Sequence, residues 1–126
     1  MILSFSLTIA LARQYGVSDP LRTGVKTVSR RDWTDKQAQR WINAYRRGDI
    51  VHNAWSALPF VQGAYHLGDF TLSIEPYPER LADMPETDLQ REGGFWRTKQ
   101  DFIDRIGKGN PDKIVWVIRW SSFILA

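Results

Sequence analysis

Apolar and polar positions alternate along the first residues of the chain. Every second residue from 3 to 9 is a large apolar one, and the intervening positions hold Ser or Thr, in the stretch MILSFSLTIALA. A period of two places the apolar side chains on one face of a strand, so residues 2–9 are predicted to form a half-buried β-strand. A secretory signal peptide is not favoured, because its apolar core is continuous and follows a basic residue.

The clearest helical pattern begins after Trp33. Thr34 and Gln37 have the spacing of a capping box, and Gly48 is positioned to end the helix. Between them, apolar side chains recur three and four positions apart and form one stripe: Ala38, Trp41, Ile42 and Tyr45. The pattern predicts a helix over residues 34–46 with this stripe packed in the core.

The remaining pattern is a set of short strands and short helices. Strands are predicted over residues 49–56, 66–75 and 113–121, with a shorter β-branched stretch at 25–30. Short helices are predicted after Asp19-Pro20, in PETDLQRE (85–92) and in TKQDFIDRI (98–106). Strands that surround short helices indicate a mixed α/β (α+β) fold, a small β-barrel with peripheral helices. The 126 residues are expected to form a single domain.

Composition narrows the chemistry that the chain can carry. There is no cysteine and there are two histidines, which excludes disulfides, thiol nucleophiles and the usual zinc sites. Asp83, Glu86 and Asp88 are interpreted as the acidic start of a helix rather than as metal ligands. We therefore expect no metal and no cofactor. The lack of cysteine fits a cytoplasmic location, and no apolar stretch has the length of a membrane span.

The charge is distributed unevenly. Residues 22–47 contain eight basic and two acidic residues, a local charge of +6, whereas residues 48–96 contain eight acidic and two basic ones, a local charge of −6. The basic block lies beside Trp33 and Trp41, a combination that suits an anionic ligand with flat bases, such as nucleic acid. Ion pairing between the two blocks across the fold explains the same distribution. Charge alone leaves both interpretations open.

The segment GVKTVSRR, residues 24–31, concentrates candidate chemistry. It resembles the hallmark of the ASCH domain family, G-x-K-x-x-E-x-R, with Gly24, Lys26 and Arg31 at the glycine, lysine and arginine and with Ser29 in place of the glutamate. A later segment, LADMPETDLQREGGF, is similar to the part of the family in which a short acidic helix runs into Glu-Gly. The resemblance covers about residues 1–120.

The resemblance implies a single PUA-like domain, residues 1–126, that acts on RNA or nucleosides. One branch of the family, the N4-acetylcytidine amidohydrolases, uses a lysine, a hydroxyl and a glutamate of the later acidic helix. On this chain those catalytic roles would fall on Lys26, Ser29 and Glu92. Other members have been linked to ribonuclease activity. The residues expected to bind the RNA or nucleoside ligand are Gly24, Thr27, Arg30, Arg31 and Trp33.

The same residues allow a chemical argument without the family. Amide hydrolysis needs a nucleophile, a base, and positive charge where the oxyanion develops. Ser29 would supply the nucleophile, and Lys26 the base if burial or the neighbouring arginines lower its pKa. Glu92 would orient the lysine or protonate the leaving amine. The alternative is a salt bridge between Lys26 and Glu92 that closes the mouth of the barrel. We expect a nucleoside- or RNA-binding domain, with hydrolysis as the alternative.

Overall fold

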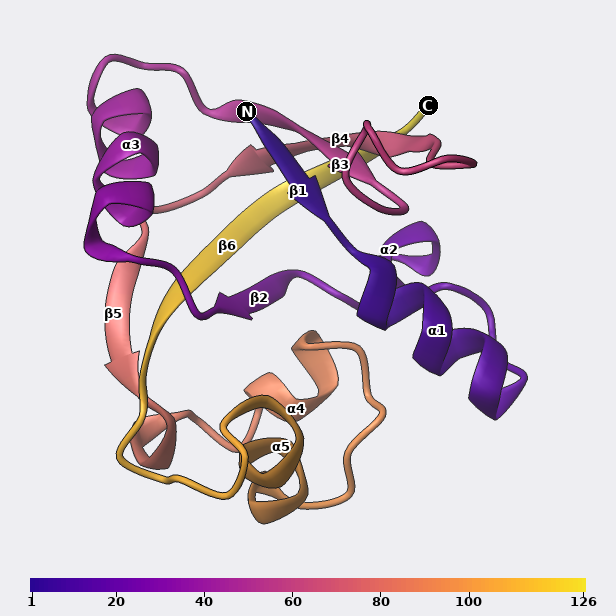
Figure 1. Cartoon of the computed structure of the whole chain (residues 1–126), viewed down its shortest axis with the longest axis vertical. Helices are drawn as coiled ribbons and strands as arrows, with labels where there is room; N and C mark the ends of the chain where they lie inside the picture. Colours follow the sequence, from indigo (N-terminus) through magenta and orange to yellow (C-terminus); the bar gives the residue numbers. More distant parts are fainter.

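The computed structural model describes residues 1–126 and contains one curled sheet with short helices around it (Figure 1). The strands are β1 (Ile2–Ser4), β2 (Val28–Arg31), β3 (Val51–Trp55), β4 (His66–Leu72), β5 (Tyr77–Arg80) and β6 (Ile114–Leu125). The helices are α1 (Ser6–Tyr15), α2 (Pro20–Thr23), α3 (Asp35–Arg46), α4 (Asp88–Arg91) and α5 (Lys99–Ile106), with a 3₁₀ turn at Leu81–Asp83. The fold is the predicted α+β type, a six-stranded half-barrel with peripheral helices.

The long strand β6 organises the sheet. The strand order is β1-β3-β4-β6-β2, and β5 pairs with β6 as well. The first part of β6 lies between β2 and β5, whereas its last part, from Trp120 onward, pairs with β4. All pairs are antiparallel except β1 with β3. Because β6 pairs with different strands along its length, the sheet bends, and β1, β2 and β5 are edge strands that each pair with one neighbour.

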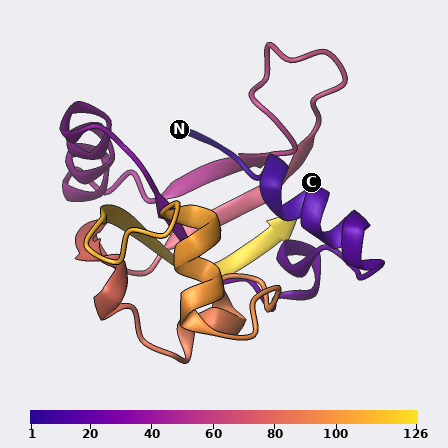
Figure 2. The ribbon, with the colours of Figure 1, turned by 60° about the horizontal axis from the view of Figure 1, so that its bottom comes forward.

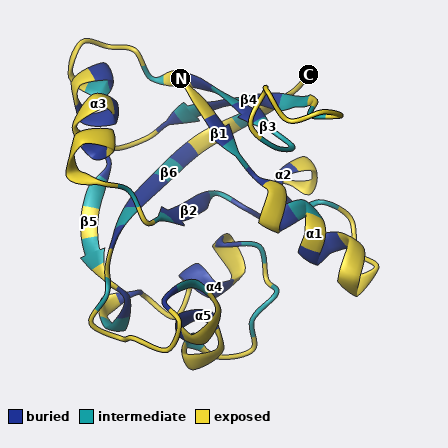
Figure 3. Ribbon diagram, in the orientation of Figure 1, coloured by how far each residue is buried: buried dark blue, intermediate teal, exposed yellow.

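Two hydrophobic clusters hold the helices against this sheet. The larger one joins β1, β3, β4 and β6 to α3, which contributes Trp41 (Figure 3). The smaller one packs Phe102 and Ile103 of α5 against Leu81, Met84 and other buried residues beyond β5. None of the helices combines the length and the apolar character that a membrane-crossing segment needs.

The prediction of a strand over residues 2–9 is wrong beyond residue 4. The chain forms β1 over three residues and then turns into α1 at Ser6. Within α1 the buried positions are Thr8, Leu11 and Ala12, which have helical spacing, whereas Leu7 is exposed. A run of alternation this short fits either structure, and the helix-forming Leu and Ala residues of the following turns decide it.

Most other predicted elements are confirmed. Helix α3 has the capping box, since the Thr34 hydroxyl accepts from Gln37 N and the Gln37 side chain accepts from Thr34 N. The strands expected over 49–56, 66–75 and 113–121 are present as β3, β4 and β6, and β6 continues to Leu125. Strand β5 was not predicted. It contains Pro78, which is tolerated because β5 lies at an edge of the sheet.

Candidate functional site

A pocket of about 210 Å³ lies where the end of β1 and the start of α1 approach β2, and the segments after α4 and at the end of α5 complete it. We call this pocket the Lys26 pocket. Figure 2 brings the side of the molecule with α4 and α5 forward. The lining residues of the pocket are Ser4, Phe5, Ser6, Leu7, Thr8, Leu11, Lys26, Ser29, Arg30, Arg31, Glu92, Trp96 and Ile106.

Lys26 is buried at the base of this site, with 3% of its surface exposed. Its Nζ donates to the carbonyl oxygens of Val28 (2.9 Å) and Glu92 (2.8 Å) and to Oε1 of the Glu92 carboxylate (3.2 Å). Burial lowers the pKa of Lys26 below its usual value, the charge of Glu92 opposes this, and the charge of Arg31 adds to the lowering. The ammonium is therefore fully hydrogen-bonded yet poorly solvated.

Gly24 allows the chain to bring Lys26 into this position. It ends α2 with a positive φ of 82°, a conformation that L side chains rarely adopt. Two residues later, Lys26 N donates to Pro20 O at 2.9 Å. The turn therefore fixes the backbone of Lys26 just before β2 begins.

Arg30 is held by carboxylates on three sides. Its Nε donates to Glu79 (2.8 Å), its Nη1 to Glu92 (2.9 Å) and its Nη2 to Asp88 (2.6 Å). Burial alone would lower the pKa of Arg30, but these carboxylates outweigh it and raise the pKa. With every edge of its guanidinium engaged, Arg30 is a fixed part of the pocket wall.

Asp88 extends this network to strand β6. It is fully buried, and Arg119 Nη1 donates to its Oδ1 at 3.0 Å. Arg119 Nε also donates to the Tyr77 hydroxyl at 3.0 Å. Burial would raise the pKa of Asp88, but hydrogen bonds from Arg119 and Arg30 hold it below its usual value. Asp88 thus anchors α4 to the sheet.

Sequence reasoning missed Glu79, Asp88 and Arg119 as partners of the site. They come from β5, α4 and β6, and no regular spacing connects them. One signal was present: Arg119 is the only charged residue in the apolar run IVWVIRW of a central strand. A cation at such a position needs a buried partner.

Ser29 and Arg31 form the other wall of the pocket. Ser29 is buried, and its hydroxyl accepts from Arg31 Nε at 2.9 Å. Arg31 Nη1 donates to Ser4 O at 2.7 Å, which links the edge strands β1 and β2, and the guanidinium carbon lies 4.9 Å from the centre of the Phe5 ring. No carboxylate pairs with Arg31, and burial lowers its pKa to about 10, opposed by the charge of Glu92.

The structure thus brings some of the sequence-predicted residues together and leaves others apart. The three catalytic candidates line the Lys26 pocket together with Arg30 and Arg31. Gly24 and Thr27 line an adjoining pocket that also includes Lys26. Trp33 does not line the Lys26 pocket; it stacks on Trp41 of α3, with ring centres 5.0 Å apart.

Half of the basic block pairs with the acidic block. Lys26 and Arg30 bind buried carboxylates, and the exposed Arg46 and Arg47 lie 2.7 Å from Glu75 and 3.6 Å from Asp49. All of these carboxylates come from residues 48–96. The remaining cations of the block have no carboxylate within ion-pair distance: Arg22, Arg31, Lys36 and Arg40. Internal pairing therefore accounts for a large part of the charge pattern.

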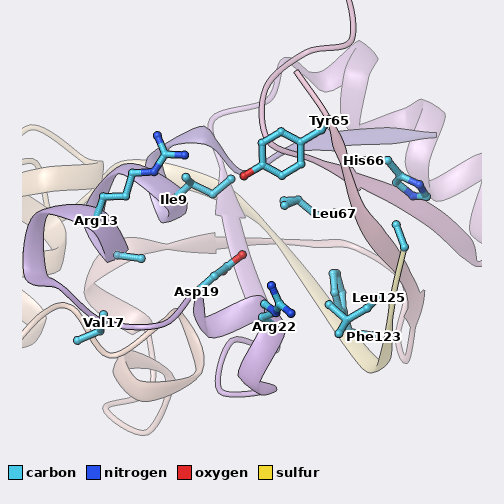
Figure 4. A pocket seen from close by; sticks show the side chains of 12 residues that line it. Ile9, Arg13, Val17, Asp19, Arg22, Tyr65, His66, Leu67, Phe123 and Leu125 are labelled. Carbon is cyan, nitrogen blue, oxygen red and sulfur yellow. The ribbon is translucent and has the colours of Figure 1, made fainter. Parts of the chain in front are cut away.

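A second pocket, of about 370 Å³, uses a different face of α1 (Figure 4). Tyr65 and Asp19 point toward its interior, and Arg22 lies near Phe123. His66 also lines it, with Nε2 2.8 Å from Oδ1 of Asp69, a partner that sequence reasoning did not identify. This pocket shares no lining residue with the Lys26 pocket.

Comparisons with known proteins add no identification. No protein family, no curated protein and no solved structure matches this chain. No group of three or more His, Asp or Glu side chains is arranged to hold a metal ion. The resemblance to ASCH domains therefore stays a prediction, based on residues 24–31 and 81–95.

Proposed function

We propose that this chain is a PUA-like domain of the ASCH type that binds a single nucleoside, free or as one exposed nucleotide of an RNA, in the Lys26 pocket. The observation that carries the proposal is the convergence of Lys26, Ser29 and Glu92, which are up to 66 positions apart in sequence, on one pocket. These are the positions at which the resemblance expects the functional residues.

The size and the lining of the pocket support a ligand no larger than a single nucleoside. Its volume of about 210 Å³ accommodates one base or a group of similar size, and not a folded strand. Apolar side chains of Phe5, Leu11, Trp96 and Ile106 form part of its lining beside the charged groups. Apolar side chains beside a few fixed polar groups are typical of sites for small molecules.

The free polar groups of the pocket support a ligand rich in acceptors. Lys26 donates all three of its ammonium protons to protein oxygens, and each guanidinium nitrogen of Arg30 donates to a carboxylate. Ser29 accepts from Arg31 but donates to no protein acceptor, and Arg31 Nη2 makes no hydrogen bond within the chain. These two donors suit the carbonyl oxygen of a pyrimidine or of an acyl group attached to it.

Hydrolysis of an N4-acylated cytidine is the second candidate, favoured by the lowered pKa of Lys26. In this reaction the Ser29 oxygen, or a water, bonds to the acyl carbon and its proton passes to the base. The bond between the acyl carbon and N4 then breaks and N4 takes a proton. If water attacked, this step releases the carboxylate; if Ser29 attacked, water must then hydrolyse the acyl-serine to release the carboxylate and restore the hydroxyl. Lys26 lies hydrogen-bonded to Glu92 and not to Ser29, so the base must change partner for this step.

Two measurements test the proposal. Isothermal titration of purified protein with cytidine and N4-acetylcytidine should give saturable binding, which Ser29→Ala weakens and Arg13→Gln, outside the pocket, leaves unchanged. Chromatography of N4-acetylcytidine incubated with the protein should detect cytidine if the chain is a hydrolase. If no cytidine forms at high protein concentration, the chain is not such a hydrolase. If neither nucleoside binds, the proposed function is wrong.

A further inference from the structure

The start of α1 leaves its backbone donors open toward the Lys26 pocket. Phe5 occupies the N-cap position and provides no side-chain cap, and the first turn has no acidic residue. The N–H groups of Ser6, Leu7 and Thr8 find no acceptor within the chain, and all three residues line the pocket. In a ten-residue helix, these unpaired donors carry the positive end of the helix dipole.

A buried hydroxyl next to these donors is also without a partner. Thr8 is only 8% exposed and lines the pocket, yet its hydroxyl makes no hydrogen bond within the chain. Ser29, 4% exposed, leaves its hydroxyl proton undonated. The Ser29 hydroxyl has one protein partner and the Thr8 hydroxyl has none, so Thr8, a residue more than nine-tenths buried, offers the pocket a free hydroxyl that suits a ligand.

The ion pairs around the pocket leave one partly buried cation without a carboxylate partner. Four cations, Lys26, Arg30, Arg91 and Arg119, lie within ion-pair distance of the three carboxylates of Glu79, Asp88 and Glu92. The cation without a partner is Arg31, whose two hydrogen bonds go to the neutral oxygens of Ser29 and Ser4. A partly buried guanidinium without a counter-charge is costly, and an anion in the pocket would remove that cost.

We infer that the start of α1 and Arg31 form a subsite for a small oxyanion, a carboxylate or phosphate group of the ligand. The backbone donors of Ser6, Leu7 and Thr8 and the Thr8 hydroxyl bind one side of the anion. Arg31 binds the other and supplies the charge. The inference deepens the proposed function and rests on it for the rest of the ligand: a carboxylate is what amide hydrolysis would release, and a phosphate is what a nucleotide would carry.

Amide-detected NMR tests this subsite directly. Sodium acetate and sodium phosphate are titrated separately into ¹⁵N-labelled protein, with sodium chloride at matched ionic strength as the control. At least one oxyanion should shift the amide signals of Ser6, Leu7 and Thr8 in a saturable way that chloride does not reproduce. If acetate saturates at the lower concentration, the subsite prefers a carboxylate; if phosphate does, the subsite prefers a phosphate group. Linear shifts, or equal shifts in chloride, overturn the subsite.

Variants separate the subsite from general surface charge. Arg31→Gln should weaken oxyanion binding about tenfold or more, and Thr8→Val roughly threefold, whereas Arg13→Gln, an exposed arginine at the other end of α1, should change nothing. Thr8→Val keeps the shape of the side chain and serves if Arg31→Gln fails to fold. An unchanged affinity in folded Arg31→Gln overturns the inference.

A parallel titration with cytidine, which carries no charge, keeps the two proposals distinguishable. Cytidine binding without oxyanion binding leaves the proposed function standing and overturns the subsite. Oxyanion binding without binding of cytidine or N4-acetylcytidine leaves the subsite standing and overturns the proposed function.

Discussion

The ammonium of Lys26 and the carboxylate of Glu92 meet as a buried ion pair, with Nζ 3.2 Å from Oε1 and 66 positions between them in the sequence. A further bond from Nζ to the Glu92 carbonyl oxygen, at 2.8 Å, ties the end of α4 to the turn before β2. The pair therefore closes one side of the pocket and joins two distant segments. The salt bridge expected as the structural alternative is present, and it occupies the same place as the candidate site.

Removing the charge of Glu92 should destabilise the fold. Glu92→Gln keeps the size of the side chain but leaves Lys26 and Arg30 each short of a buried counter-charge, which costs about 3 kcal/mol in free energy of unfolding. Urea denaturation measures this loss. Glu75→Gln, which breaks an exposed pair with Arg46, is the control and should change little, because solvent screens that pair. Equal losses of unfolding free energy in the two variants would show that the buried ion pair stabilises the fold no more than the exposed one.

The stability of the protein should fall in acid through Asp88. Its pKa is lower in the folded state than in the unfolded chain, because hydrogen bonds from Arg119 and Arg30 outweigh burial. Between the two pKa values the unfolded state binds more protons, so the stabilisation is complete above about pH 4 and is lost as the pH falls through the folded value.

Asp88→Asn tests this assignment. Urea denaturation should show a large loss of stability at pH 7, and the gap between variant and parent should narrow as Asp88 of the parent becomes protonated. Asp83→Asn removes an exposed carboxylate whose pKa Arg80 lowers through hydrogen bonding, and it should show a much smaller difference. If the difference in unfolding free energy between Asp88→Asn and the parent stays constant with pH, groups other than Asp88 cause the loss of stability in acid.

Substitutions of two tryptophans, Trp33 and Trp96, should separate stability from binding. Trp33 stacks on Trp41 outside the pocket, so Trp33→Ala should lower stability by roughly 1–2 kcal/mol and leave cytidine affinity unchanged. Trp96 lines the pocket, and Trp96→Ala should weaken cytidine binding. Calorimetric titration and thermal melts measure both quantities. Weaker binding in Trp33→Ala alone would restore Trp33 as a ligand-binding residue.

The cations at the end of α3 should contribute little to the salt dependence of RNA binding. Arg46 and Arg47 already pair with Glu75 and Asp49, so these two release few counterions when RNA binds. Fluorescence anisotropy of a short single-stranded RNA between about 50 and 200 mM salt measures the slope. A steep slope that flattens by about one unit in an Arg46→Gln variant would contradict the internal pairing and show a phosphate-binding surface.

The sequence predicts local structure well where a single physical signal dominates. Thr34 and Gln37 predict the start of α3 because a capping box satisfies two backbone donors at once. The apolar run of β6 predicts a central strand because both of its faces are covered. The signal was ambiguous at residues 2–9, where three residues of strand pass directly into α1.

The site was only partly predictable, because it is assembled by tertiary contacts. The motif at residues 24–31 identified Lys26 and Ser29, and the acidic segment identified Glu92. The contribution of Thr8 could not be foreseen once its segment was interpreted as a strand. Asp88 and Arg119 meet because β6 and α4 pack together, and no local pattern encodes that contact.

The most direct test of nucleoside binding in the Lys26 pocket is a crystal structure of the protein soaked with N4-acetylcytidine. We predict density for the pyrimidine between Phe5 and Trp96, with an oxygen of the ligand within hydrogen-bonding distance of Ser29 or Arg31. Density for cytidine without its acetyl group would indicate that the protein has hydrolysed the ligand. An empty Lys26 pocket at a ligand concentration that saturates other sites, or ligand bound only in the pocket beside Tyr65 and His66, would contradict the account.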